Sequence, residues 1–105
     1  MTIDTGCSSS GMALHLACQA LRDPDTIAHS ALVGGTNLFI NPELAISMSI
    51  TNVLSSTSGC KTFDEKADGY ARGEGINCIY LKRLSDALRD GDPVRAVIRS
   101  SAINS

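Results

Sequence analysis

Cys7 is the residue of this sequence best placed to do chemistry. It follows Gly6, which permits a tight backbone turn, and it comes just before a segment of helical character, residues 8–21. A cysteine at such a turn lies beside the free N–H groups of the first helical turn, which favour the thiolate over the thiol. The position predicts a nucleophile. The alternative interpretation is a small, buried apolar residue in a serine-rich turn.

The remaining cysteines and the histidines add no second catalytic or metal-binding pattern. The cysteines at positions 18, 60 and 78 form no CxxC pair and no His/Cys spacing typical of zinc, so no metal site is expected. Reduced thiols are expected, because nothing else suggests a secreted protein. His15 would lie about two helical turns beyond Cys7, too far for an easy proton relay. His29 is expected in a loop or at a strand edge.

Strand-like and helical segments alternate along the chain, which predicts an α/β domain. Strands are expected at residues 1–6, 30–33, 76–81 and 94–99. Helices are expected at residues 8–21, 42–50 and 84–89. The first of these helices is apolar nearly all round, as in a buried helix, and a proline at position 24 should end it.

Residues 60–75 are the least regular part of the sequence. Charged side chains alternate there with three glycines, but the spacing fits neither a phosphate-binding glycine loop nor a calcium loop. From these residues alone, a charged, solvated loop held by local hydrogen bonds is expected.

Charge and hydropathy exclude several classes of partner. The formal net charge is −2 and the basic residues form no stripe, which argues against binding to nucleic acid or to an anionic membrane surface. No apolar segment has the length that a membrane-spanning helix needs, and no signal peptide is expected. The sequence therefore predicts a cytoplasmic protein.

The run from Asp4 to Ser10, with Cys7 at its centre, resembles the active-site signature of β-ketoacyl synthases. The ketosynthase domains of polyketide synthases are particularly similar. The likeness continues, in the same order, through residues 13–22, 31–37, 60–64, 67–75 and 81–93. Gly6 departs from the family, which more often has alanine at this place.

This resemblance implies a fold. The chain is similar to a portion of the N-terminal half of a layered αβαβα ketosynthase, which is a thiolase-like fold. A mixed sheet is implied, with a buried helix after the nucleophile. Residues 1–105 would then be a partial ketosynthase domain made of the nucleophile turn, the helix, loop 60–75 and the strands that follow it.

The resemblance also implies a reaction. Cys7 would accept an acyl group from a thioester carried on the phosphopantetheine arm of an acyl carrier protein, and its backbone N–H would be an oxyanion donor. A decarboxylative Claisen condensation would follow, in polyketide or fatty acid biosynthesis. No cofactor is expected to be bound by the chain itself. Its implied partners are the carrier protein and other synthase domains, with a homodimer in the full-length protein.

Other implied roles are less complete. Asp64, Asp68 and Arg72 would lie in a loop near the active-site entrance, with a structural or gating role. The family's two catalytic histidines and its lysine come from motifs further downstream, and neither His15 nor His29 lies in such a motif. The isolated chain is therefore expected not to catalyse condensation.

Two alternatives stay open. The chain could be a non-catalytic element that serves only for dimerisation or as a scaffold, through an exposed strand edge. It could also be a hydrolase whose cysteine sits on a sharp strand-to-helix turn. That turn requires glycine two residues before and two after the nucleophile, where this sequence has Thr5 and Ser9.

Overall fold

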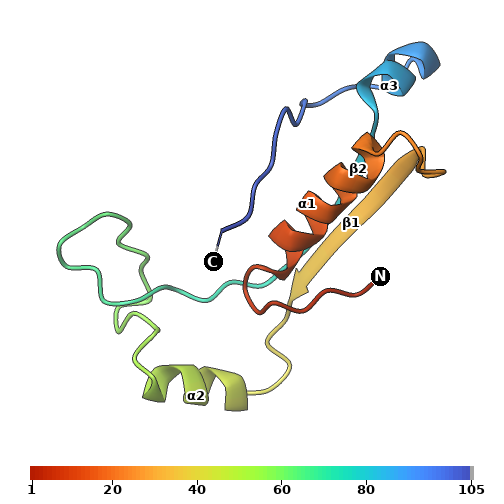
Figure 1. Ribbon diagram of the computed structural model, residues 1–105. Coiled ribbons are helices and arrows are strands. Elements are labelled where there is room, and N and C mark those ends of the chain that lie inside the picture. The colour runs from red at the N-terminus through yellow and green to blue at the C-terminus, as the bar shows by residue number, and fades with distance from the viewer. Residues whose placement is uncertain (105) are drawn as a thin grey trace. The chain divides into compact units, whose positions relative to one another are not determined.

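The computed structural model describes residues 1–104 and contains three helices and two strands (Figure 1). Their order is α1 (Ser9–Arg22), β1 (Ser30–Asn37), α2 (Glu43–Ile50), β2 (Gly75–Lys82) and α3 (Leu84–Asp90). The chain divides into two compact units, and each is described by itself below. The first contains residues 1–35 and the chain from Ile76 onward, and the second contains Thr36–Gly75. The predicted α/β class is confirmed.

The first unit is built on the pairing of β1 with β2, and α1 lies along β1 (Figure 1). Its buried apolar side chains are Cys18 and Leu21 on α1, Val33 on β1 and Ala87 on α3. The rest of α1 is half-buried or exposed, so the prediction of a buried helix is wrong for most of its length. The reason is that the described residues supply two strands and no further layer of helices. The core of this unit is therefore small.

The C-terminal end of α1 is set by the local sequence and by one residue distant in the chain. The helix runs from Ser9 to Arg22, within one residue of the predicted bounds at each end, and Pro24 follows shortly after it. Arg83 closes its C-terminal end, where the guanidinium Nε donates to the carbonyl of Leu21 at 2.7 Å. A positive group is favoured at this place, because the last carbonyls of a helix lack intrahelical partners.

The C-terminal end of α3 is determined by the residues next to it. Gly91 takes a left-handed conformation with a φ of 73°, and the Asp92 N–H donates to the carbonyl of Ala87 at 2.9 Å. Glycine is the residue that adopts this conformation most readily, so the helix ends where the sequence predicts. Lys82 Nζ binds both Asp90 and Asp92 at 2.5 Å. These two carboxylates raise the pKa of Lys82 above its ordinary value.

Two predicted strands are wrong. Residues 1–6 form no strand, because neighbouring side chains take up their backbone donors: Thr5 N–H donates to Ser9 Oγ at 2.9 Å and Gly6 N–H to Asp4 Oδ1 at 3.1 Å. Residues 94–99 form no strand either, and no strand among residues 1–104 pairs with them. The segment is held instead by Arg22, whose guanidinium donates to the carbonyl of Ile98 at 3.3 Å.

The second unit holds α2 and a long irregular loop. α2 begins directly after Pro42, which is favoured at a helix start because its φ is fixed near the helical value. Beyond Thr51 the chain contains no helix or strand until β2 begins at Gly75. Within this irregular loop, an isolated bridge joins Leu54 to Tyr70. Within residues 1–104, no helix has both the length and the hydropathy to cross a membrane.

Gly69 is required by the close approach of these two backbone segments. Its φ is 132°, and a Cβ placed there would lie 2.6 Å from both the Leu54 carbonyl carbon and the Ser55 nitrogen. Backbone atoms cannot move aside as the end of a flexible side chain can, so any larger residue must separate the segments.

We expect Gly69→Ala to lower the free energy of unfolding by about 2 kcal/mol or more, from overpacking and from the positive φ. Urea denaturation measures the change. Gly73→Ala is the matched control, because a Cβ at Gly73 meets no atom within 4 Å. Equal stability of the two variants would contradict the required close approach.

Candidate active site

Cys7 lies at a tight turn in front of α1, as the sequence predicts. Gly6 has a φ of 68°, in the left-handed region that favours glycine. The Cys7 side chain is exposed and its thiol is free. The alternative of a small apolar residue buried in the turn is therefore wrong for this cysteine.

Hydroxyl groups hold the turn in shape. Ser9 Oγ donates to the carbonyl of Gly6 at 2.6 Å, and the Ser9 N–H donates to the same oxygen at 3.2 Å. Ser8 Oγ donates to the carbonyl of Thr5 at 2.9 Å. These contacts fix the backbone on both sides of Cys7 while leaving its side chain in solvent. The serine-rich sequence around Cys7 thus has a direct structural purpose.

Cys7 precedes the helix proper. Ser8 is the N-cap residue and Ser9 the first helical residue, so Cys7 stands one position outside the cap. The N–H groups of the first turn, those of Ser10 and Gly11, have no intrahelical acceptor and give this end of α1 its partial positive charge. The first turn carries no acidic residue that would offset this charge.

Gly35, two residues before the end of β1, sets how closely the start of α1 approaches the sheet. A Cβ at Gly35 would lie 2.9 Å from Ser10 Cβ, whereas a Cβ at Gly34 would meet only an ordinary contact of 3.6 Å with the carbonyl of Asn77. The first turn of α1, and with it the Cys7 turn, is therefore positioned by the absence of a side chain at Gly35.

The other thiols lie in different surroundings. Cys18 is buried within α1, and Cys78 is exposed on β2. Cys60 is exposed, and its Sγ accepts the Ala71 N–H at 3.2 Å. His15 is partly buried on α1 and its Nδ1 lies 3.0 Å from Ser101 Oγ, while His29 is exposed just before β1. No metal-binding group of His, Cys, Asp or Glu occurs among the described residues.

The three loop residues expected near an entrance are each engaged within the second unit. Asp64 accepts the Lys66 N–H at 2.8 Å and so closes a local turn. The Arg72 guanidinium carbon lies 4.2 Å from the centre of the Phe39 ring, a cation–π distance. Phe39 is itself fixed, because its N–H donates to Glu74 Oε1 at 2.6 Å.

Asp68 has the most partners of the three. Its carboxylate accepts hydrogen bonds from Ser55 Oγ at 2.9 Å and from Ser56 Oγ at 3.1 Å. Lys61 Nζ lies 2.6 Å from the same carboxylate. Sequence reasoning missed Ser55 and Lys61, because the contacts join positions of an irregular loop that no helical or strand periodicity relates. The loop is held by local hydrogen bonds, as predicted, and several of them meet at the Asp68 carboxylate.

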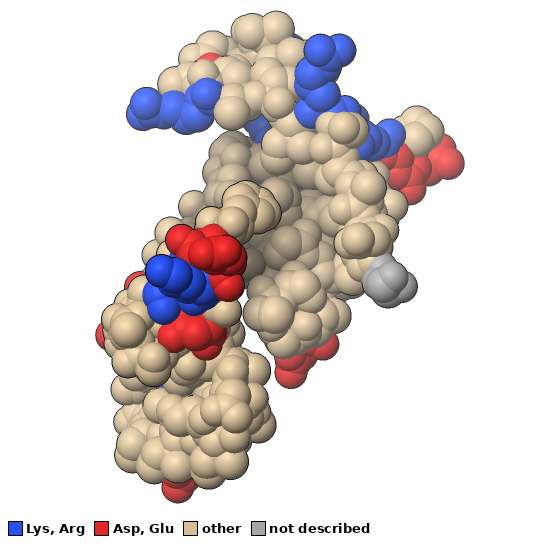
Figure 2. Space-filling model, turned by 90° about the vertical axis from the view of Figure 1, so that its left-hand side faces the viewer, with Lys and Arg blue, Asp and Glu red and all other residues tan. Residues whose placement is uncertain are grey.

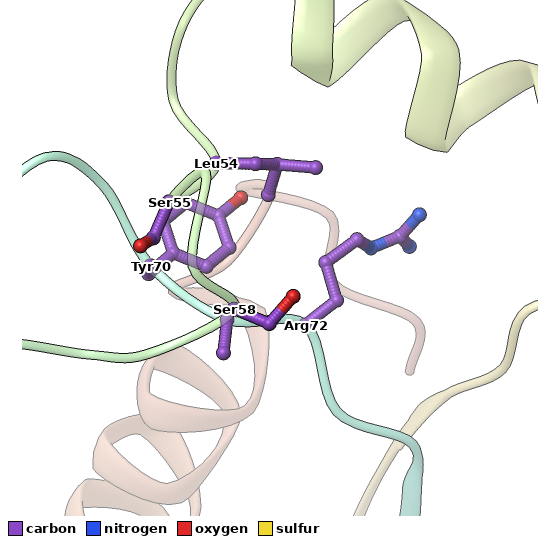
Figure 3. Close-up of a pocket in the computed structure, with 6 residues that line it drawn as sticks. Leu54, Ser55, Ser58, Tyr70 and Arg72 are labelled. Atoms are coloured by element: carbon purple, nitrogen blue, oxygen red, sulfur yellow. The ribbon is translucent and has the colours of Figure 1, made fainter.

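A small cavity lies between the two ends of this loop (Figure 3). Its volume is about 230 Å³. It is lined by Leu54, Ser55, Ser58, Tyr70, Ala71 and Arg72. In Figure 3 the Arg72 guanidinium extends away from the side chains of Ser55 and Tyr70. The cavity is thus walled mainly by apolar and hydroxyl groups.

Charge is mixed on the surface. Figure 2 shows acidic side chains directly beside basic ones at more than one place on the face that it presents. This arrangement agrees with the net charge of −2. No continuous basic field of the kind that attracts nucleic acid is visible on this face.

The family is decided by comparison with known proteins. The family described as "Beta-ketoacyl synthase, N-terminal domain" matches residues 1–87. The chain belongs to the β-ketoacyl synthase family. The likeness seen around Cys7 is thus confirmed over most of the sequence.

Its relatives include polyketide synthases of fungi and bacteria. The chain is 56% identical over 103 residues to the highly reducing polyketide synthase gloL of Glarea lozoyensis, covering 98% of this chain and 4% of that protein. It is 54% identical over 104 residues to a phenolphthiocerol/phthiocerol polyketide synthase of Mycobacterium tuberculosis, covering 99% of this chain and 5% of that protein. The chain therefore spans a very small part of these curated relatives.

Solved ketosynthases share the fold. The oxazolomycin ketosynthase domain from Streptomyces albus JA3453 matches with a TM-score of 0.87 and 44% identity, over 95% of this chain and 18% of that one. The ketosynthase from module 6 of the bacillaene synthase of Bacillus subtilis 168 matches with a TM-score of 0.81 and 46% identity, over 88% of this chain and 16% of that one. The implied thiolase-like ketosynthase fold is confirmed as a partial one.

We expect Gly35→Ala to slow alkylation of Cys7 by iodoacetamide about threefold or more, because the added methyl group displaces the first turn of α1 and the Cys7 turn attached to it. Peptide mass spectrometry gives the rate at each cysteine. Gly34→Ala should leave the Cys7 rate unchanged. If both variants label Cys7 at the wild-type rate, the spacing at Gly35 does not position the turn.

Proposed function

We propose that Cys7 is the acyl-accepting nucleophile of a ketosynthase. The observation that carries this proposal is the free, exposed thiol at the left-handed turn in front of α1, in a chain of the β-ketoacyl synthase family. A nucleophile needs this access, because the acyl donor must reach the sulfur.

The first half-reaction is a transfer between thiols. The Cys7 thiolate attacks the carbonyl carbon of an acyl thioester, and a new carbon–sulfur bond forms to Cys7. The bond to the carrier's sulfur breaks, and the carrier leaves as a thiolate that takes a proton from water. The tetrahedral intermediate carries a negative oxygen, for which the Cys7 backbone N–H is our proposed donor.

The second half-reaction, decarboxylative condensation with a malonyl-type extender, needs groups beyond these. His15 is engaged with Ser101 and His29 is exposed, and neither lies in a motif that the family uses for this step. We propose that residues 1–105 act as one part of a larger ketosynthase domain. This is supported by their coverage of only 16% and 18% of the solved ketosynthase chains. Alone, the chain would accept an acyl group without condensing it.

The proposed partners follow from the same assignment. Acyl groups would arrive on the phosphopantetheine of an acyl carrier protein, within a polyketide synthase that works as a homodimer. A cytoplasmic location suits this chemistry, since thiols stay reduced there. Fatty acid biosynthesis would use the same two half-reactions.

A scaffold role is the second candidate, and one observation favours it. Apolar side chains on both strands are open to solvent, with Leu32 on β1 73% exposed and Ile76 on β2 74% exposed. Such surfaces are typical of places that another layer or another chain covers. If this were the only role, loss of the Cys7 thiol would have no consequence.

We expect the chain to become singly acylated at Cys7 when it is incubated with a short-chain acyl thioester of N-acetylcysteamine. Intact and peptide mass spectrometry measure the extent and the place of acylation. Cys7→Ser should abolish this transfer, because a serine hydroxyl is a far weaker nucleophile at neutral pH.

Cys60→Ser is the matched control, since Cys60 is also an exposed, free thiol. This variant should be acylated as fast as the unmodified chain. Acylation that occurs first at Cys60 or Cys78 would contradict a primed nucleophile at Cys7.

A further inference from the structure

We propose that the Asp68 cluster, formed by Asp68 with Ser55, Ser56 and Lys61, is a closure device that holds the loop of residues 54–70 shut and so creates the cavity between its ends. This inference is independent of the role proposed for Cys7, because all the residues involved lie in the second unit. It concerns local opening of one loop rather than the stability of the whole chain.

The cavity exists only while the loop is closed. Leu54, Ser55 and Ser58 come from one end of the loop, and Tyr70, Ala71 and Arg72 come from the other. The ends are joined by two backbone hydrogen bonds, Ser55 N–H to the Tyr70 carbonyl at 3.0 Å and Tyr70 N–H to the Val53 carbonyl at 3.1 Å. If the ends separate, the walls of the cavity separate with them.

Side chains reinforce this backbone junction from one side. Asp68 lies two residues before Tyr70, and its carboxylate binds the hydroxyls of Ser55 and Ser56 on the opposite segment. Ser55 is the one buried polar residue among those described, at 8% exposed. Since a buried hydroxyl must keep a partner, separation from Asp68 is costly as long as Ser55 stays buried.

Lys61 holds the same carboxylate from within the loop. Its Nζ is 2.6 Å from Asp68 Oδ1, and both side chains are about one-third exposed, at 32% and 33%. A partly shielded, charge-assisted contact of this kind is stronger than a fully exposed ion pair. Two segments, at positions 55–56 and 61, therefore converge on the carboxylate at position 68.

The two backbone segments are in close contact at this junction. Gly69 brings the chain so close to Leu54 and Ser55 that no side chain fits between them. The hydrogen bonds of Lys61 and Ser55 lower the pKa of Asp68 below its ordinary value. The contribution of this carboxylate to closure is therefore present in full above its ordinary pKa of about 4, and it is lost progressively as the pH falls from there toward the lowered pKa.

The test is amide hydrogen exchange on the 105-residue chain. We expect Asp68→Asn to speed exchange in the peptides that contain Ser55 and Tyr70 about tenfold or more, while α1 keeps its wild-type rate. Lys61→Met should also speed exchange in these peptides. It carries less risk of misfolding, because it removes only the ammonium group of a partly exposed side chain. The single substitution Lys61→Arg should leave exchange at the wild-type rate, since arginine keeps the positive charge and the hydrogen-bond donors.

Glu65→Gln is the matched control: it removes one negative charge from an exposed position of the same loop and should change nothing. Faster exchange confined to residues 53–58 and 68–72 in both Asp68→Asn and Lys61→Met would support the closure device. The proposal is overturned if these variants behave like Glu65→Gln, or if α1 loses protection to the same extent as the loop.

Discussion

The left-handed backbone at Gly6 is the constraint on which the candidate site depends. A φ of 68° turns the chain sharply enough for α1 to begin at Ser9, with Cys7 left outside the helix and in solvent. The hydroxyls of Ser8 and Ser9 then bind the carbonyls of Thr5 and Gly6, so the turn is closed by its own side chains. The chemistry proposed for Cys7 rests on this geometry rather than on a network of catalytic side chains.

At two places in the molecule, a glycine allows neighbouring segments to approach more closely than a side chain would permit. Gly35 lets the start of α1 approach β1, and Gly69 lets two loop segments touch through their backbones. In both places a single methyl group would displace a neighbour. Glycine therefore acts here less through flexibility than through the space it leaves empty. The two units use the same physical means for different ends, one to position a helix and the other to close a loop.

Sequence reasoning found what local signals determine. Pro42 and Gly91 mark the start of α2 and the end of α3, and each helix lies within one residue of its predicted bounds. It failed at residues 1–6, where neighbouring side chains take up the backbone donors, and at residues 94–99, where the outcome depends on distant partners. Residues 94–99 have strand-like composition, but a strand needs a neighbour, and the carbonyl of Ile98 is taken by Arg22. The partners of Asp68 were missed for the same reason, since contacts across an irregular loop leave no periodic pattern.

The small number of buried apolar side chains has a thermodynamic consequence. Only Cys18, Leu21, Val33 and Ala87 are buried among the apolar residues described. The heat-capacity change of unfolding arises chiefly from apolar surface that becomes hydrated. A unit that is held together by groups such as Arg83 on the Leu21 carbonyl should therefore have a shallow stability curve. Its free energy of unfolding would change little between cold and ambient temperatures, unlike that of a protein with a large hydrophobic core.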